Sequence, residues 1–231
     1  MLFSYFYKKK AMFKKWLSYF VPILIYEKKS ALSKNLEITW NNGELVLDSK
    51  NTNYSYGSLQ RILRIGLTHI GFQNVFKMEN ILVLGVAGGS VIKTLANEIK
   101  YSGRITGVEI DPEIIAMANK YFHLDQIPNL QIVIDDAFEF VLKTKEKYDL
   151  IIIDIFQDTT MPNFLFEKFF ANRLGMLLND KGFLLFNTMT LTESHNLRNE
   201  KYISEFDSSQ FKVEKIPRLE AHNELLVIQK T

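Results

Sequence analysis

Residues 81–90 read ILVLGVAGGS, and this stretch decides the fold. Residues 81–84 predict a short strand, and the small residues after it let the backbone turn sharply into a helix over residues 90–99. Such a turn also lets a ligand approach the backbone closely, with the free amides of the helix start facing it. The turn is not a phosphate-binding P-loop, because no Gly-Lys-Ser/Thr sequence follows.

Beyond this turn, strand and helix patterns alternate. Strands are predicted at residues 105–108, 130–134, 149–153 and 183–186, and helices at 137–143 and 163–178, with a turn at 179–182 before the last strand. A further helix should begin at Pro112, with Asp111 as its cap. This alternation predicts a parallel sheet with helices on both faces. Residues 211–215 and 224–229 read as two strands without a helix between them, so an antiparallel pair should close one edge. The predicted fold class is α/β, with a mostly parallel seven-stranded sheet.

A smaller element precedes this sheet. Residues 36–48 alternate between apolar and polar and contain Asn42-Gly43, a pair typical of a tight hairpin turn. Residues 21–26 read as a further strand, and a helix should run from Ser58 to Gly71. We therefore expect an N-terminal helix and β-hairpin subdomain over residues 1–57 and a main domain over residues 58–231.

Composition excludes several kinds of site. The chain has no cysteine, which rules out disulfides, zinc–thiolate sites and cysteine nucleophiles and suits a reducing cytoplasm. The histidines fit no metal-ligand spacing, so no metal is expected. Residues 1–30 hold seven lysines against Glu27 alone, a local charge of +6, which leaves −4 for the remainder of a chain with net charge +2. A body of that charge argues against nucleic-acid binding, which needs a distributed basic face.

The N-terminal stretch is also rich in aromatic residues. Lysines interrupt it too often for a membrane span, and no small-residue cleavage site follows, so neither a transmembrane segment nor a secretory signal is expected. Two interpretations remain. The stretch is a helix that docks on a membrane surface or a partner, or it is a frayed start followed by a helix whose aromatic face packs on the body. We favour the second.

Acidic residues follow three of the predicted strands, where open α/β sheets bind their ligands. Glu109 ends the second strand, and an acid there accepts both hydroxyls of a ribose. Asp135 and Asp136 follow the third strand; one can accept the amino group of an adenine while the other caps the next helix, and either residue fits either role. Asp154 follows the fourth strand, where a carboxylate can orient an amine or take its proton.

The ordered set Gly85, Glu109, Asp136 and Asp154 resembles the spermidine synthase family and its class I methyltransferase relatives. The resemblance covers roughly residues 36–190 and is closest in GVEIDP (107–112), DDAFEF (135–140) and YDLIIID (148–154). It implies a Rossmann-like transferase domain and a donor that is S-adenosylmethionine or its decarboxylated form. Glu109 would hold the ribose, Asp136 the adenine amino group, and Asp154, the catalytic residue, the acceptor amine. The donor would contact Gly85, Ala87, Gly88, Gly89, Glu109, Asp135, Asp136 and Ala137.

The sequence departs from the family at two positions. Aminopropyltransferases carry an aspartate in the glycine turn, where this chain has Gly88, and a second aspartate where it has Gln157. Asp158 can replace the latter only if the loop shifts by one residue. Tyr54 and Tyr56 lie where the family places residues that gate the substrate. The family pattern favours aminopropyl transfer and the two departures favour methyl transfer, so the sequence leaves both open.

The predicted function is transfer of an aminopropyl or methyl group to a small-molecule acceptor, an amine, in the cytoplasm. The family pattern links such a transferase to polyamine biosynthesis. The resemblance also implies a homodimer, because dimers are common in the family. Three alternatives are a methyltransferase of unknown substrate, a nucleoside-binding protein without catalysis, and a nicotinamide-dependent oxidoreductase.

Overall fold

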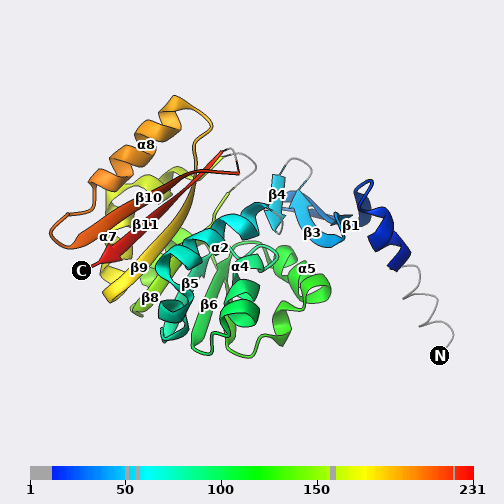
Figure 1. Ribbon diagram of the computed structural model, residues 1–231, viewed down its shortest axis with the longest axis horizontal. Helices are drawn as coiled ribbons and strands as arrows, with labels where there is room; N and C mark the ends of the chain where they lie inside the picture. The colour runs from blue at the N-terminus through cyan, green and yellow to red at the C-terminus, as the bar shows by residue number, and fades with distance from the viewer. Residues whose placement is uncertain (1–11, 50–51, 56–57, 157–159, 221) are drawn as a thin grey trace.

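The computed structural model describes residues 12–49, 52–55, 58–156, 160–220 and 222–231. They form two sheets, a four-stranded one near the N-terminus and a seven-stranded one in the body of the molecule (Figure 1). The sequence predicts a domain boundary between residues 57 and 58. Residue 57 lies outside the described part of the chain, so this boundary stays a prediction.

The seven-stranded sheet confirms the predicted fold class. Its strands are β5 (Asn80–Leu84), β6 (Arg104–Glu109), β7 (Leu130–Ile134), β8 (Tyr148–Ile153), β9 (Leu178–Met189), β10 (Phe211–Leu219) and β11 (Asn223–Lys230). They lie in the order β10-β11-β9-β8-β5-β6-β7, with β5 to β9 parallel and the last two antiparallel. The chain leaves β5 towards β6 on one side and later returns to β8 on the other. The topological switch point therefore lies between β5 and β8, where such sheets bind ligands.

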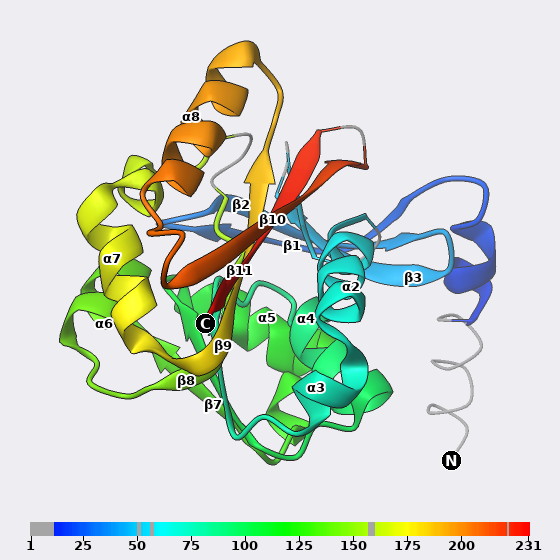
Figure 2. The same cartoon turned by 60° about the vertical axis from the view of Figure 1, so that its left-hand side comes forward.

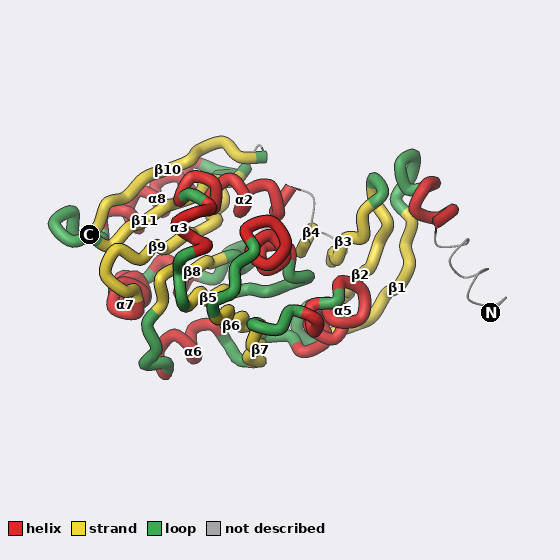
Figure 3. The backbone as a smooth tube through the Cα atoms, turned by 60° about the horizontal axis from the view of Figure 1, so that its bottom comes forward, coloured by secondary structure: helices red, strands yellow, loops and turns green. Residues whose placement is uncertain are grey.

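Helices cover both faces of this sheet (Figures 2 and 3). One face carries α2 (Ser58–Ile70), α3 (Phe72–Phe76), α4 (Ser90–Lys93) and α5 (Pro112–Phe122), and the other carries α6 (Ala137–Lys143), α7 (Lys168–Leu177) and α8 (Glu193–Ser204). Successive residues of a strand point to opposite faces, so Ile81 and Val83 join one core cluster while Leu82 and Leu84 join the other.

Several elements differ from those predicted. The helix after the glycine turn continues as a π-helix over Thr94–Ile99. The helix expected over residues 163–178 divides into a 3-10 turn, Asn163–Phe166, and α7. The turn expected at residues 179–182 is an irregularity within β9, where the register with β8 shifts and Lys181 has φ 63°. The sequence predicted neither α3 nor α8.

The N-terminal sheet contains the predicted hairpin and two further strands. β1 (Ile23–Ser30), β2 (Lys34–Asn41), β3 (Glu44–Ser49) and β4 (Thr52–Ser55) pair antiparallel in chain order. The turn between β2 and β3 has φ 48° at Asn42 and 77° at Gly43, the two positive values that this hairpin turn requires. Leu36, Ile38 and Leu47 pack against apolar side chains of α5, which joins the sheet to the body.

The helix before β1 differs from our favoured interpretation. It covers residues 12–17, and Phe13, Trp16 and Phe20 are exposed, so their rings do not pack on the body. The reason lies in Ser18, which is buried and whose Oγ accepts the Gly43 amide at 3.0 Å. This contact holds the end of the helix against the hairpin turn and leaves its aromatic face outside. Residues 1–11 lie outside the described chain, so the predicted frayed start is not tested. Among the described helices, none is long and apolar enough to cross a membrane.

Asp111 joins the two sheets. Its side chain is buried, and one oxygen accepts the hydroxyls of Ser30 and Ser33 from the turn between β1 and β2. The other oxygen accepts the Glu113 amide at 2.9 Å and so caps α5, as predicted. One carboxylate therefore both starts a helix and holds the N-terminal sheet.

We expect Asp111→Ala to lower the free energy of unfolding by about 2 to 4 kcal/mol, because it removes a helix cap and leaves two hydroxyls without their acceptor. Urea unfolding measures the change. The exposed Asp125 supplies the control, since Asp125→Ala should shift the value by less than about 0.5 kcal/mol. Equal losses in the two variants would contradict this role of Asp111.

Candidate active site

The residues after four parallel strands lie side by side. The Gly85 amide donates to the Val108 carbonyl of β6 at 3.0 Å, and the Asp154 amide donates to Leu84 of β5 at 2.9 Å. The Asp135 amide donates to the Glu109 carbonyl at 3.2 Å. Each bond continues the sheet by one step beyond the end of its strand. The structure thus brings the predicted site residues at 85–89, 109, 135 and 154 to one carboxyl edge.

The glycine turn is packed tightly against the end of β8. Its backbone is left-handed at Gly85 (φ 88°), Ala87 (φ 48°) and Gly89 (φ 79°). A Cβ atom at Gly85 would lie 2.3 Å from the carbonyl oxygen of Asp154. Both the backbone angle and the available space therefore require glycine at this position. Ala87 adopts the same conformation at a cost of about 1 kcal/mol.

Glu109 lies in a cradle of backbone amides. Its carboxylate is 8% exposed; Oε2 accepts the amides of Val86 and Ala87, each at 3.1 Å, and Oε1 accepts the amide of Asp111 at 3.2 Å. Burial raises the pKa of Glu109, and the amides, led by that of Ala87, oppose the rise. The predicted ribose acid thus touches the glycine turn directly.

The acids after β7 take separate positions. Asp136 caps α6, with its Oδ1 accepting the Phe138 amide at 2.7 Å. Asp135 accepts the Asp136 amide at 2.9 Å. Of the two assignments that the sequence left open, the helix cap therefore falls to Asp136, and α6 begins at Ala137. One carboxylate can cap and bind a ligand at once, because it has two oxygens and about four acceptor positions.

Asp154 is held by a chain of two buried amides. Its Oδ1 accepts Nδ2 of Asn187 at 2.9 Å, and Oδ1 of Asn187 accepts Nδ2 of Asn223 at 3.0 Å. Burial raises the pKa of Asp154 to about 6, with the Asn187 bond opposing the rise. A carboxyl group that titrates close to neutral pH can take a proton from a reacting group.

Sequence reasoning missed Asn187 and Asn223, although a signal for the first was present. The predicted fifth strand ended at residue 186, so Asn187 is the residue directly after a strand, as Asp154 is after the fourth. Asn187 carries no charge, so a pattern of acids at strand ends does not include it. Asn223 begins β11, and only the pairing of β11 with β9 places it beside Asn187.

The predicted acceptor-side residues are less fully described. Tyr54 lies in β4, but the structure does not describe its side chain. Tyr56, Gln157 and Asp158 lie outside the described residues. Their proposed contacts therefore stay predictions.

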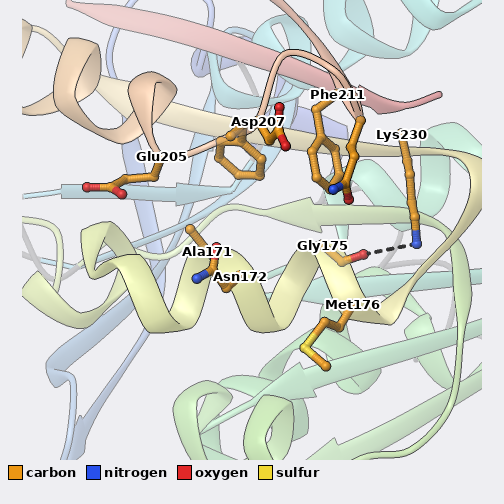
Figure 4. A pocket seen from close by; sticks show the side chains of 10 residues that line it. Ala171, Asn172, Gly175, Met176, Glu205, Asp207, Phe211 and Lys230 are labelled. Carbon is orange, nitrogen blue, oxygen red and sulfur yellow. Dashed lines mark hydrogen bonds between the residues drawn. The ribbon is translucent and has the colours of Figure 1, made fainter.

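A cavity of about 380 Å³ lies elsewhere, between α7, the end of α8, the start of β10 and the end of β11 (Figure 4). Phe211 and Lys230 line it and are paired in the sheet. Gln229, beside Lys230, pairs with Phe183 in the first half of β9. The cavity is thus displaced towards the amino ends of the parallel strands, away from the glycine turn.

Comparison with known proteins adds to this geometry. Residues 62–219 match the family profile described as the spermine/spermidine synthase domain. A polyamine aminopropyltransferase of Vibrio vulnificus is 31% identical over 145 residues, which cover 62% of this chain and 48% of that protein. The chain spans about half the length of the curated relatives it matches.

Solved structures share the fold. A spermidine synthase in complex with the transition-state analogue AdoDATO has a TM-score of 0.64 at 20% identity, over 90% of this chain and 73% of that one. Human methyltransferase-like protein 13, in complex with SAH, has a TM-score of 0.61 at 20% identity, over 76% of this chain and 83% of that one. At such identity the likeness concerns the fold alone.

We expect Asp154→Asn to stabilise the protein above neutral pH. The pKa of this group rises from 3.8 to about 6 on folding, so the folded state holds a proton that the unfolded chain has released. The stability of the natural chain therefore falls as pH rises from about 4 through about 6, and the variant lacks this fall. The variant should gain about 2 to 3 kcal/mol near pH 8 and almost nothing near pH 4.

Urea unfolding at both pH values measures the difference. Asp180→Asn, at a residue whose side chain is almost fully exposed, is the control and should show no pH-dependent gain. A variant of Asp154 that is equally destabilised at both pH values would contradict the burial of this carboxyl group.

Proposed function

The chain belongs to the spermine/spermidine synthase domain family, and on that basis we propose that it transfers an alkyl group from S-adenosylmethionine or its decarboxylated form to an amine. One observation carries the proposal. The glycine turn, Glu109, Asp135 and Asp154 follow four parallel strands and lie at one carboxyl edge, beside the β5/β8 switch point. Two proteins of the same fold bind the transition-state analogue AdoDATO and SAH, which supports a related ligand here.

Glu109 is suited to the donor ribose. A carboxylate offers about four acceptor positions, and the amides of Val86, Ala87 and Asp111 occupy three of them. A ribose diol needs two. Donor binding therefore requires Glu109 to release one amide, and an amide of the turn is then available to the ligand. Asp136 would accept the adenine amino group on the oxygen that does not cap α6.

Asp154 is suited to the acceptor. The nitrogen lone pair of the amine forms a bond to the carbon attached to the donor sulfur, and the electrons of the breaking C–S bond return to sulfur, which becomes a neutral thioether. The nitrogen loses its proton to the Asp154 carboxylate. Asn187 donates to one oxygen of Asp154 and so aims the other. The protein otherwise supplies alignment, since the sulfonium is already a good leaving group.

We propose a small-molecule amine as the acceptor and leave the transferred group to experiment. Relatives named polyamine aminopropyltransferases support an aminopropyl group and a polyamine product. Gly88, where the family carries an aspartate, supports a methyl group. The homodimer and the cytoplasmic location stay predictions.

Calorimetric titration with S-adenosylmethionine, its decarboxylated form and methylthioadenosine tests the proposal. A preference for the decarboxylated donor assigns aminopropyl transfer, and a preference for the intact donor assigns methyl transfer. Asp154→Asn should retain donor binding and lose turnover with an amine acceptor. Binding without turnover in the natural chain would support the nucleoside-binding alternative, and binding of neither donor by a folded chain would refute the proposal.

We expect Gly88→Asp to raise the affinity for the decarboxylated donor by about tenfold or more, because a charge-assisted hydrogen bond to its free amino group contributes about 1.5 to 3 kcal/mol. The left-handed positions of the turn fall on Gly85, Ala87 and Gly89 rather than on Gly88, so the backbone accepts a side chain there. Gly88→Asn, of the same shape without the charge, is the control. An equal gain in both variants would contradict a role for charge.

A further inference from the structure

The helix before β1 and the turn that follows it present three exposed aromatic rings in a row. Phe13, Trp16 and Phe20 are 61%, 59% and 71% exposed. The ring centroids of Phe13 and Trp16 lie 6.4 Å apart and those of Trp16 and Phe20 5.4 Å apart. We call these three side chains the aromatic surface. Large apolar groups gathered on the outside of a protein mark an interaction site.

The aromatic surface lies within the most basic part of the chain. Lys14 and Lys15 come from the same helix turns, and Nζ of Lys15 lies 5.6 Å from the ring centre of Trp40. Residues 1–30 together carry a charge of +6, with seven lysines against Glu27. Residues 1–11 continue the same chemistry in the sequence, with four aromatic residues and three lysines. A partner of this surface must therefore be both apolar and negatively charged.

The position of the helix leaves the surface accessible. The helix lies at the periphery of the molecule, beyond β1, in every view (Figures 1, 2 and 3). Ser18 fixes its end to the hairpin turn through the Gly43 amide. Val21 and Leu24, which are also exposed, extend the apolar area towards β1.

We propose that the aromatic surface binds the surface of a bilayer that contains anionic phospholipids. Tryptophan and phenylalanine rings enter the boundary between headgroups and acyl chains, and lysines beside them keep their charges among the phosphates. A second copy of the chain is a poorer partner, because it would bring one charge of +6 against another. None of the described helices is long and apolar enough to cross a bilayer.

Vesicle binding of the full chain tests the proposal. The chain should co-sediment with vesicles of phosphatidylglycerol and phosphatidylcholine and not with vesicles of phosphatidylcholine alone. The sequence has two tryptophans, so Trp40→Phe leaves Trp16 as the only one. Its emission should shift to shorter wavelength on the anionic vesicles.

Two variants separate the apolar and the charged contributions. The triple variant Phe13→Ser, Trp16→Ser, Phe20→Ser should abolish co-sedimentation. Lys14→Glu with Lys15→Glu should lower vesicle affinity by at least about tenfold, since each lysine near an anionic surface contributes about fivefold. The control Met176→Ser with Leu197→Ser removes two apolar side chains that are equally exposed elsewhere and should bind as the natural chain does. Unfolding midpoints confirm that all variants are folded.

Equal binding to neutral and anionic vesicles, or no binding to either, would overturn the proposal. So would a concentration-dependent dimer that the triple serine variant abolishes, because the aromatic surface would then lie between two copies. The titration with donors does not depend on vesicle binding. A chain that fails to bind vesicles would therefore leave the proposed function intact.

Discussion

The buried carboxylate of Glu109 is the constraint on which the site depends. It draws the amides of Val86, Ala87 and Asp111 towards one point, and these amides come from the turn after β5 and from the start of α5. The left-handed backbone conformation is unfavourable for Ala87. It is stabilised here because it lets the amides of Val86 and Ala87 donate to the same Glu109 oxygen. Without this charge, the close contact of the turn with the end of β8 would lose its electrostatic support.

The two acids of the site differ because their surroundings differ. Backbone amides, led by that of Ala87, oppose the effect of burial on the pKa of Glu109, whereas a single side-chain amide opposes it on Asp154. Backbone amides cannot rotate away, so they hold the Glu109 carboxylate in place until a ligand competes for one of its acceptor positions. Asp154 has one side-chain partner and a pKa of about 6, which suits the proton acceptor that the proposed function requires. Environment, rather than residue type, separates their roles.

The sequence predicted the sheet and the edge where the site lies, because apolar runs with period two and glycine turns are local signals. It could not predict the partners that only the sheet order creates. Asn223 meets Asn187 because β11 lies antiparallel beside β9, and no local pattern contains that pairing. The polar helix α8 offered little apolar periodicity. Asp135 and Asp136 are adjacent, and a sequence pattern does not decide which of two adjacent acids caps the following helix. The aromatic helix misled us because apolar residues usually indicate burial, whereas here the contact of Ser18 with Gly43 turns them outward.

The N-terminal sheet is tied to the site through one residue. Asp111 accepts the hydroxyls of Ser30 and Ser33 with its side chain and donates its amide to Glu109. Two hydrogen-bonded steps therefore separate the turn between β1 and β2 from Glu109. The aromatic surface is attached to the other end of the same sheet, at the turn between β2 and β3. A bilayer bound at that surface would thus set the orientation of the carboxyl edge relative to the membrane, since the antiparallel strands and the buried Asp111 carboxylate lie between them. An acceptor amine would then approach this edge from a direction that the membrane sets.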